Sequence, residues 1–458
     1  MRNPFTKDRA YYRDLFFLAV PVALQNLISF LVTFADNLMV GSLGNEAVSG
    51  VYMGSQLQTL LGMLSFGVSG TIAIIGAQYW GKRDTLSMRK LVAIGMRLSV
   101  AVGAVFTLAG FLFPEPIVRI FTQEEGVVRE GAIYLKYVSF SFFFFCATQP
   151  LIAAMRSVER TNTGMIVSLT SLIVNVGLNY VLIYGKLGFP AMGVKGAAIA
   201  TVYSRVAETI CILCIALKMD KRLCLTPSDF LLRDTALLRD FVRYGAPLVA
   251  GEIVWSVNMM ANSAIIGQYD AAVITAVSVA NTMNTLAYVT IGGMATAVGI
   301  ITGKTIGAGK TGLMKEYAYT TQAIFLILGA VMGTFVALMN APFVSLYENI
   351  TPAAAEQARQ FIRVLSVTII GTCYQMPCLF GLVKSGGDIS FVFKNDSIFV
   401  FLVVLPSAFI ASRLGAAPWV VFFCLKCDQI LKCFVAVVKV NRFDWMKNLT
   451  RGAAAEAS

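Results

Sequence analysis

The sequence predicts an all-α polytopic membrane protein with about twelve transmembrane helices in two pseudo-symmetric six-helix lobes. The first observation is composition, since 57% of the 458 residues are hydrophobic and only 14% are charged, whereas soluble domains carry roughly 25% charged residues. The second is a mean hydropathy of +0.72. Apolar runs of about 20 residues, the length that crosses a bilayer, recur from end to end, without the alternation of membrane-barrel strands. The third is an internal repeat.

Apolar segments mark the predicted helices in chain order. The first set lies near 14–40, 50–78, 91–113, 131–155, 164–184 and 194–217. The second set lies near 240–266, 276–303, 318–340, 358–382, 392–412 and 417–438. We therefore expect an N-lobe over 1–217, a polar cytoplasmic linker over 218–239, and a C-lobe with a cytoplasmic tail over 240–458. The last helix is the least regular, because Lys426, Asp428 and Lys432 interrupt its apolar run.

The two halves of the chain repeat at a fixed spacing. An offset of 226 residues aligns Pro21 with Pro247 (247 − 21). The same offset pairs Gly41 with Gly267, Gly67 with Gly293, Gly81 with Gly307, and Pro116 with Pro342. Because each half spans six helices, both halves enter the membrane from the same side, so the repeat is parallel and its axis lies along the membrane normal. Two such bundles facing a central cavity alternate access by rocking against each other.

The net charge of +12 reflects the orientation of the chain rather than nucleic-acid binding. Loops that share a side with the N-terminus carry most of the basic residues, among them Lys82, Arg83, Lys221 and Arg222, and the alternate loops carry fewer. Basic loops face the cytoplasm. We therefore expect a multi-pass protein of the cell membrane with both termini cytoplasmic and with no nucleic-acid partner.

Several classes of chemistry are excluded by what the sequence lacks. It has no histidine, which removes histidine-based zinc sites and Ser-His-Asp triads. It has no G-x-x-x-x-G-K-[ST] phosphate loop, so ATP hydrolysis is not expected. The nine cysteines lie mostly within apolar runs as small packing residues, without the spacing of a disulfide framework. We predict no enzymatic activity and no cofactor, and we expect an ion gradient to supply the energy.

One acid, Asp36, lies in the first apolar run, in the stretch SFLVTFADNLMVG. A charge near the bilayer centre costs roughly 2.5–3.5 kcal/mol on insertion scales, so such an acid indicates a functional site. Asn175 and Asn179 in the fifth run are four residues apart and share a helix face, and Thr201 lies in the sixth. This set of oxygen ligands suits Na⁺ or a protonated acid. In the alternative interpretation, the asparagines only hydrogen-bond neighbouring helices.

Few other charges lie deep in the apolar runs. Glu252 falls near the middle of the seventh run. Arg205 and Glu208 in the sixth run are three residues apart, which favours a local structural ion pair over a functional site. Pro21 kinks the first helix, because proline removes a backbone donor. The kink is either static or a moving hinge, and the presence of Asp36 on the same helix strengthens the case for a hinge.

Several longer stretches carry a family resemblance. They are PVALQNLISFLVTFADNLMVGSLG, GAQYWGKRD, NVGLNYVLIYGKLGFPAMGVKGAAIAT, GAPLVAGEIVW and GKTIGAGK. With them the chain resembles the MATE transporters, the multidrug and toxic compound extrusion family, and most of all its NorM-type branch. The resemblance covers roughly 14–440 and implies a twelve-helix fold of two lobes, with cation-coupled export of amphipathic, often cationic, organic compounds.

The resemblance also implies roles for individual residues. Those that match the family's N-lobe cation or proton site are Asp36, Asn175, Asn179 and Thr201. Glu252 matches the acid of the seventh helix, and Pro21 matches the proline proposed to bend when the first-helix acid is protonated. This sequence departs from the NorM type in the tenth helix, where GTCYQMPCLFGLVKSGG contains no acid. We therefore expect coupling at Asp36, with Glu252 serving the charge of the substrate.

The leading hypothesis is a monomeric secondary antiporter that exports organic cations or drugs in exchange for Na⁺ or H⁺. If Na⁺ is the coupling ion, we expect it at Asp36, Asn175 and Asn179. An alternative within transport is a flippase for lipid-linked saccharide, although the first lobe lacks the basic mid-helix cluster typical of such cavities. A membrane enzyme would turn over without a gradient, and a passive channel would leak ions without substrate. The sequence leaves the coupling ion and the substrate open.

Overall fold

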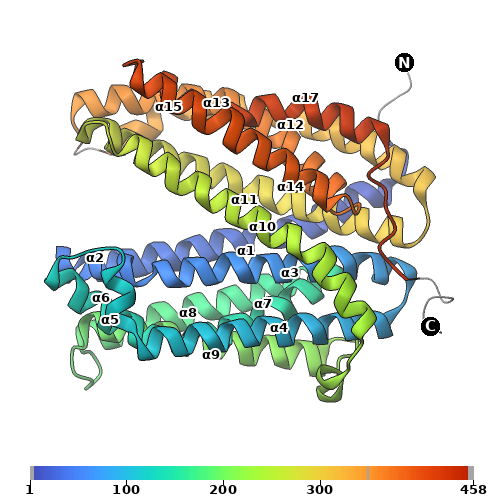
Figure 1. The fold of residues 1–458 in the computed structure, drawn as a ribbon, viewed down its shortest axis with the longest axis horizontal. Coiled ribbons are helices and arrows are strands. Elements are labelled where there is room, and N and C mark those ends of the chain that lie inside the picture. The colour runs from blue at the N-terminus through green and yellow to red at the C-terminus, as the bar shows by residue number, and fades with distance from the viewer. Residues whose placement is uncertain (1–4, 348–349, 452–458) are drawn as a thin grey trace. The chain divides into compact units, whose positions relative to one another are not determined.

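The computed structural model describes residues 5–347 and 350–451, which form helices joined by loops with no strand among them (Figure 1). The helices of the first half are α1 (Arg9–Gly41), α2 (Asn45–Gly54), α3 (Gln56–Lys82), α4 (Thr85–Leu112), α5 (Pro114–Arg119), α6 (Glu125–Val138), α7 (Phe140–Ser157), α8 (Asn162–Tyr184) and α9 (Gly193–Cys214). A π-helical turn, η1 (Ile215–Met219), extends α9, and a 3₁₀ turn, η2 (Pro227–Leu231), lies in the linker.

The second half follows a similar plan. Its helices are α10 (Thr235–Ile266), α11 (Ala271–Gly307), α12 (Thr311–Ser345), α13 (Pro352–Met376), α14 (Ile389–Ile398), α15 (Leu405–Arg413), α16 (Pro418–Cys424) and α17 (Asp428–Arg442). Two π-helical segments continue these helices, since η3 (Pro377–Lys384) follows α13 and η4 (Phe399–Val404) joins α14 to α15. Both lie beside a proline, Pro377 or Pro406, which has no N–H for the α-helical hydrogen bond to the preceding turn.

Ten helical segments of the described chain are long and apolar enough to cross a membrane, and the bent pair α6 and α7 makes an eleventh. That pair covers the predicted run 131–155 and bends by 50°. The last predicted run, 417–438, is divided between α16 and α17, at the charged residues that interrupt its apolar character. The all-α membrane fold that the sequence predicts is confirmed, with the last run as its irregular member.

The described chain forms two compact units. Unit 1 comprises the described residues within Met1–Ala23, Ala77–Arg83 and Ala250–Ser458, and unit 2 comprises Leu24–Gly76 and Asp84–Val249. The first halves of α1 and α10 therefore belong to different units from their second halves. The change comes after Ala23 in α1 and after Val249 in α10, positions that differ by the repeat offset of 226 (249 − 23). In each helix it follows the matched proline, Pro21 or Pro247, by two residues.

Glycines that match in the repeat allow close helix crossings at this point. Within unit 2, a Cβ added to Gly67 of α3 would lie 2.5 Å from Cγ2 of Val249. Within unit 1, a Cβ added to Gly293 of α11 would lie 2.8 Å from the backbone N of Ala23. Each is shorter than real Cβ contacts, so only glycine fits. Gly67 and Gly293 are offset by 226, as are Ala23 and Val249, so the two crossings are equivalent under the repeat.

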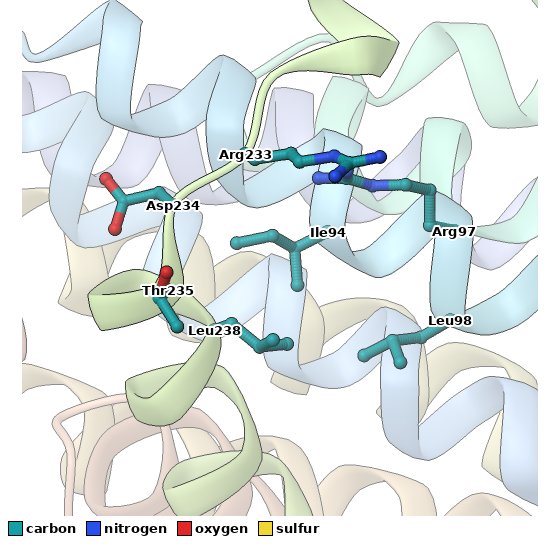
Figure 2. Close-up of a pocket in the computed structure, with 7 residues that line it drawn as sticks. All are labelled: Ile94, Arg97, Leu98, Arg233, Asp234, Thr235 and Leu238. Atoms are coloured by element: carbon teal, nitrogen blue, oxygen red, sulfur yellow. The ribbon is translucent and has the colours of Figure 1, made fainter.

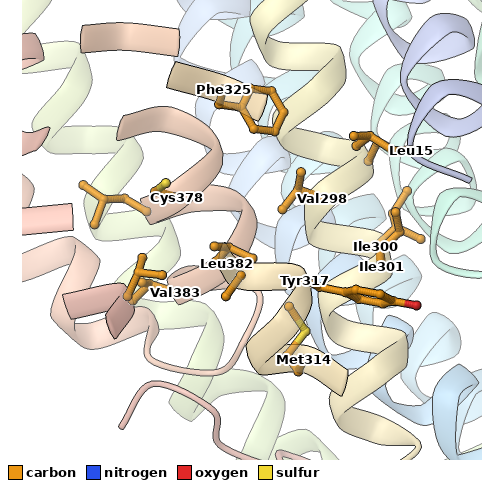
Figure 3. Close-up of a cluster of buried hydrophobic side chains, with 14 of the residues drawn as sticks. Leu15, Val298, Ile300, Ile301, Met314, Tyr317, Phe325, Cys378, Leu382 and Val383 are labelled. Carbon is orange, nitrogen blue, oxygen red and sulfur yellow. The ribbon is translucent and has the colours of Figure 1, made fainter. Parts of the chain in front are cut away.

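Unit 1 has a buried apolar cluster formed by α1, α11, α12 and η3 (Figure 3). Leu15 of α1 packs there with Val298 of α11, Phe325 of α12 and Leu382 of η3, and none of the four is more than 5% exposed. Among membrane helices such contacts stabilise through close packing rather than through exclusion of water. The beginning of α1 is therefore an integral part of the core of unit 1.

Unit 2 has its own core, in which Leu135, Phe142 and Cys146 are fully buried. Helix α9 packs against α6, α7 and α8 in this unit. These contacts fix the position of α8, whose polar face carries Asn175 and Asn179. All nine cysteines are free, as their positions in the sequence predict.

The residues after α17 form a strap, which we define as 443–451, that lies against the rest of unit 1. Trp445 is fully buried. The ammonium of Lys447 pairs with Asp388 at 2.8 Å, and its carbonyl accepts a hydrogen bond from Nε2 of Gln78 at 3.2 Å. The strap thus fixes the end of α3, a helix of the first half, to helices of the second half.

Candidate functional site

Asp36 lies near the C-terminal end of α1 and is half-buried. Its Oδ1 accepts a hydrogen bond from Nδ2 of Asn179 on α8. The same Nδ2 donates to Oδ1 of Asn175, one turn earlier on α8, at 3.2 Å. All three residues belong to unit 2, so the structure brings together three of the four side chains that the sequence predicts for the N-lobe site.

Two polar atoms of this cluster have no hydrogen-bond partner among the described residues. They are Nδ2 of Asn175 and Oδ1 of Asn179, and the two side chains are only 1% and 0% exposed. A buried group left without a partner costs about 1–3 kcal/mol. A monovalent cation beside the Asp36 carboxylate, or a proton on it, would give the Asn179 oxygen a partner. The residues present therefore fit both coupling ions.

Thr201 is placed differently from the sequence expectation. It is buried on α9, the helix that packs against α8. Its hydroxyl donates to the carbonyl of Ala197 on its own helix at 3.0 Å. Within residues 5–347 and 350–451, no hydrogen bond joins Thr201 to Asp36 or to either asparagine. Its hydroxyl oxygen keeps a lone pair for a ligand, but the threonine does not hold the carboxylate.

Two groups that the sequence analysis did not assign to the site lie within electrostatic range of Asp36, namely Tyr134 of α6 and Arg205 of α9. The guanidinium of Arg205 pairs with Glu208 at 2.8 and 2.9 Å and lies 5.2 Å from the ring centroid of Phe145. The predicted ion pair within α9 is therefore confirmed. Its position beside Asp36 gives it an additional electrostatic influence on the site.

The sequence holds one signal for Tyr134. In the repeat it pairs with Phe361 at an offset of 227 (361 − 134), so a hydroxyl is present in one half and absent from the other. Tyr134 is 8% exposed. An unmatched polar group in an otherwise matched apolar position is a usable indicator of a site that only one half possesses.

Glu252 lies on the part of α10 that belongs to unit 1 and is half-buried. Among the described residues it forms no ion pair within 4 Å. Its electrostatic neighbours are Lys384 at the end of η3 and Asp396 of α14. Glu252 thus faces both a base and an acid without a direct contact to either.

Two of the three charges that interrupt the last apolar run, Asp428 and Lys432, are compensated within unit 1. The ammonium of Lys432, a residue only 6% exposed, lies 2.8 Å from Asp396 and 3.1 Å from Asp428. Gln429 donates to the carboxylate of Asp428 at 3.0 Å and accepts from Nε2 of Gln375 of α13 at 2.9 Å. Buried charges are tolerated when they are paired and hydrogen-bonded in this way, which explains charged residues in a membrane helix.

Comparison with known proteins agrees with this architecture. The model of the MatE family matches residues 21–181 and 247–410, two segments that begin at the matched prolines. The chain is 27% identical over 370 residues to the probable multidrug resistance protein NorM of Thermotoga maritima, covering 78% of this chain and 76% of that protein. It is 25% identical over 368 residues to the probable multidrug resistance protein YoeA of Bacillus subtilis, covering 78% and 77%.

The fold is also that of solved structures. A MOP superfamily transporter from Pyrococcus furiosus superposes with a TM-score of 0.85 at 19% identity, covering 96% of this chain and 99% of that one. A crystal structure of a MATE protein in complex with MaL6 superposes with a TM-score of 0.85 at 20% identity, covering 94% and 97%. The family segments cover well over half of the sequence. The chain therefore belongs to the MatE family, the MATE transporters, and is not an enzyme.

Proposed function

We propose that this MATE transporter is a secondary active antiporter, which exports amphipathic or cationic organic compounds in exchange for Na⁺ or H⁺ bound at Asp36. The observation that carries the proposal is the carboxylate of Asp36, held by Asn179, whose buried amide oxygen has no hydrogen-bond partner among the described residues. The relatives named as probable multidrug resistance proteins support the class of substrate.

The coupling ion is proposed to neutralise the one carboxylate near this site that lacks a basic partner. Glu208 is already paired with Arg205, whereas among the described residues Asp36 has neutral amide neighbours and the more distant charge of Arg205. A proton or Na⁺ on Asp36 removes the charge that membrane burial penalises. Asn175, Asn179 and the free lone pair of Thr201 supply the remaining oxygen ligands.

The substrate competes with the ion through differential affinity. A cationic compound gains from an uncompensated Asp36 or from Glu252, which has no ion-pair partner among the described residues. Because a ligand shifts a conformational equilibrium only by its difference in affinity for the two states, exchange follows when ion and drug stabilise opposite states. Glu252 then recognises the charge of the substrate in the half of the chain whose tenth helix contains no acid.

Pro21 is proposed as the hinge that transmits occupancy of Asp36. It lies in the same helix, which stays continuous from Arg9 to Gly41. This helix leaves unit 1 for unit 2 two residues after the proline. A change in the bend at Pro21 would therefore change the orientation of the second half of α1, which contains Asp36, relative to its first half.

The proposal includes the disposition of the chain in the membrane. We propose that it functions as a monomer in the cell membrane, with both termini cytoplasmic. The excess of basic residues in alternate loops supports this orientation. We further propose that the moving lobes are 1–217 and 240–458, joined by the linker 218–239, since the repeat supports two equivalent halves.

The test is efflux of an organic-cation dye from proteoliposomes, with Na⁺ and pH gradients imposed separately. We expect one of the two gradients to drive efflux by the wild type and neither to drive efflux by Asp36→Asn, although that variant inserts and purifies normally. Full gradient-driven efflux by Asp36→Asn would refute the assignment of the site. Translocation of lipid-linked saccharide in place of dye would favour the flippase alternative.

A further inference from the structure

A pocket of about 280 Å³ lies in unit 2, where the linker meets α4 (Figure 2). It is lined by Ile94, Arg97 and Leu98 of α4 and by Arg233, Asp234, Thr235 and Leu238 of the linker and the first turn of α10. None of these residues contributes to the ion site or to the proposed substrate contacts. The pocket is therefore a separate feature whose purpose the antiport mechanism does not explain.

The pocket is a fixed part of the fold, because the linker is fastened to α4 by several contacts of basic side chains. Arg89 lies 3.7 Å from Asp229 and Lys90 lies 3.1 Å from Asp234. Further along α4, Nη2 of Arg97 donates to the carbonyl of Leu232. These contacts hold the wall formed by the linker at one place on the surface of α4.

Two arginines, Arg97 and Arg233, line this pocket, and neither forms an ion pair with a described residue. Within the described part of the chain, the guanidinium of Arg97 is hydrogen-bonded only to backbone carbonyls, of Ala93 at 3.1 Å and of Leu232. Arg233 is exposed and forms no ion pair with any described residue. The neighbouring carboxylate, that of Asp234, pairs with Lys90 instead. It also caps α10 by accepting a hydrogen bond from the Leu237 N–H at 2.9 Å.

The close-up agrees with this reading. In Figure 2 the side chains of Arg97 and Arg233 extend toward one another, and the carboxylate of Asp234 points away from them. Two guanidinium groups converging on one pocket repel each other unless an anion lies between them. Arginine pairs of this kind bind phosphate through charge-assisted, bidentate hydrogen bonds.

The remaining wall is apolar and open. Leu98 and Leu238 are 36% and 37% exposed, and Ile94 lies beside them. Residues 98–113, which follow Arg97 directly, contain no charged side chain, so Arg97 marks the point where α4 enters the hydrocarbon region. A ligand here meets positive charge at the level of the head groups and apolar side chains below it.

We propose that this pocket binds an anionic phospholipid, with its phosphate between Arg97 and Arg233 and the start of an acyl chain along Leu98 and Leu238. Basic pockets beside membrane helices on the cytoplasmic side bind anionic lipid head groups in this way. The positive-inside pattern puts the linker on the cytoplasmic side. The site rests on the orientation given under the proposed function, with the linker on the cytoplasmic side, but not on the antiport mechanism.

The experiment is native mass spectrometry of the full-length transporter in mild detergent, with equal amounts of phosphatidylglycerol and phosphatidylcholine added. We expect the wild type to retain phosphatidylglycerol in preference to phosphatidylcholine. Each arginine near an anionic lipid surface is worth about 1 kcal/mol, which is about fivefold in affinity. Arg233→Gln should therefore bind phosphatidylglycerol about fivefold more weakly, and Arg97→Gln with Arg233→Gln about 25-fold more weakly.

The matched control is Arg129→Gln on α6, because its side chain is also an arginine, is 71% exposed and is paired, among the described residues, with Glu130 at 3.6 Å. It should leave lipid retention unchanged. Arg97 also supports the linker, so Arg233→Gln, which breaks no described contact, decides the outcome if Arg97→Gln unfolds. Equal retention of both lipids by the wild type, or unchanged retention by Arg233→Gln, would overturn the proposal.

A second arm distinguishes a lipid from free phosphate. Millimolar inorganic phosphate should displace little phosphatidylglycerol, because the apolar wall contributes to binding the lipid. Leu98→Asn with Leu238→Asn should weaken lipid retention and leave the fold intact, since both side chains are already partly exposed. Complete displacement by inorganic phosphate, with no effect of the leucine substitutions, would assign the pocket to a soluble phosphate and refute the lipid.

Discussion

At the scale of single residues, the amide of Asn179 is the group on which the geometry of the proposed ion site depends. It hydrogen-bonds the carboxylate of Asp36, and it also donates to Oδ1 of Asn175. Both asparagines are buried, and a buried polar group that loses its partner costs about 1–3 kcal/mol. The site is therefore more sensitive to this neutral side chain than its lack of charge suggests.

The first prediction concerns Asn179→Ala. A hydrogen bond to a charged group is worth about 1.5–3 kcal/mol, so the affinity for the coupling ion should fall roughly 10- to 100-fold. The measurement is the ion concentration that gives half-maximal dye efflux in proteoliposomes. The control is Asn37→Ala, because Asn37 adjoins Asp36 on the same helix but is exposed and has no described partner. An unchanged ion dependence in Asn179→Ala would contradict the geometry.

The second prediction concerns the ion pair of α9. Arg205→Gln leaves the buried carboxylate of Glu208 without its partner, and breaking a buried pair on one side costs about 3–5 kcal/mol. The melting temperature in detergent should therefore fall strongly. Replacing both residues, by Arg205→Met with Glu208→Gln, should restore most of the loss. A double variant no more stable than the single one would show that the arginine acts through other contacts.

At the scale of elements, the repeat explains why glycines recur at matched positions near the ends of α3 and α11. A Cβ on Gly81 would overlap the carbonyl oxygen of Lys304, and one on Gly307 would overlap that of Gln78. Gly81 and Gly307 differ by 226, as do Gln78 and Lys304. The two contacts are therefore equivalent under the repeat, and each requires the absence of a side chain.

The third prediction follows from these crossings. Gly307→Ala forces the backbones apart, and overpacking of this kind costs about 1–3 kcal/mol. Gly312→Ala on α12 is the matched control, because a Cβ there meets nothing within 4 Å, and alanine gains up to about 1 kcal/mol of helix propensity. Thermal unfolding in detergent should thus move in opposite directions. A stabilised Gly307→Ala would contradict the close crossing.

The fourth prediction concerns the acid that anchors the strap. Burial raises the pKa of Asp388, but hydrogen bonds from Lys439 and Lys447 outweigh it and hold that pKa below its usual value. A lowered folded-state pKa contributes stability that is present above the ordinary carboxyl pKa and lost as the pH falls through the folded value.

Stability should therefore decline below about pH 4, the ordinary range of an aspartate pKa, and Asp388→Asn should flatten that decline while lowering stability at neutral pH. The measurement is the melting temperature between acidic and neutral pH. Limited proteolysis after residue 442 should accelerate in parallel as the strap is released. A pH profile identical in wild type and variant would exclude Asp388 as the titrating anchor.

At the scale of the whole molecule, the fold could be predicted because its helices are uncharged runs and its halves share prolines at a constant offset. The division of α1 and α10 between the two units could not be predicted, because it depends on contacts between segments that are distant in the sequence. It takes place where Pro21 and Pro247 are followed by Ala23 and Val249. The matched glycines Gly67 and Gly293, which allow the close helix crossings at these points, are the sequence feature that indicates this division.

The candidate site was predictable to a similar degree. An acid in an apolar run and two amides four residues apart are enough to place Asp36, Asn175 and Asn179 together. The hydroxyl of Thr201 was not predictable, because a buried threonine can bond the carbonyl one turn earlier instead of a ligand. The position of Tyr134 near Asp36 was not predictable either, because it depends on how α6 packs, and hydrophobic periodicity does not define that packing.

Charge balance over the molecule bears on stoichiometry. Around Asp36, the embedded acids Asp36 and Glu208 face one base, Arg205. The corresponding charges of unit 1 compensate each other, with Glu252, Asp396 and Asp428 against Lys384, Lys426 and Lys432. Under the proposed mechanism, one acid without a basic partner predicts exchange of about one coupling cation per cycle, carried by Asp36.

The central claim, that ion and substrate compete through Asp36, is tested most directly by cation release on substrate binding. Purified transporter in weakly buffered detergent is titrated with an organic-cation dye, while a pH indicator and a Na⁺ electrode record what is displaced. We predict release of about one cation per bound dye from the wild type, and no release from Asp36→Asn, which still binds dye through Glu252. Equal release from Asp36→Asn and wild type would contradict the account.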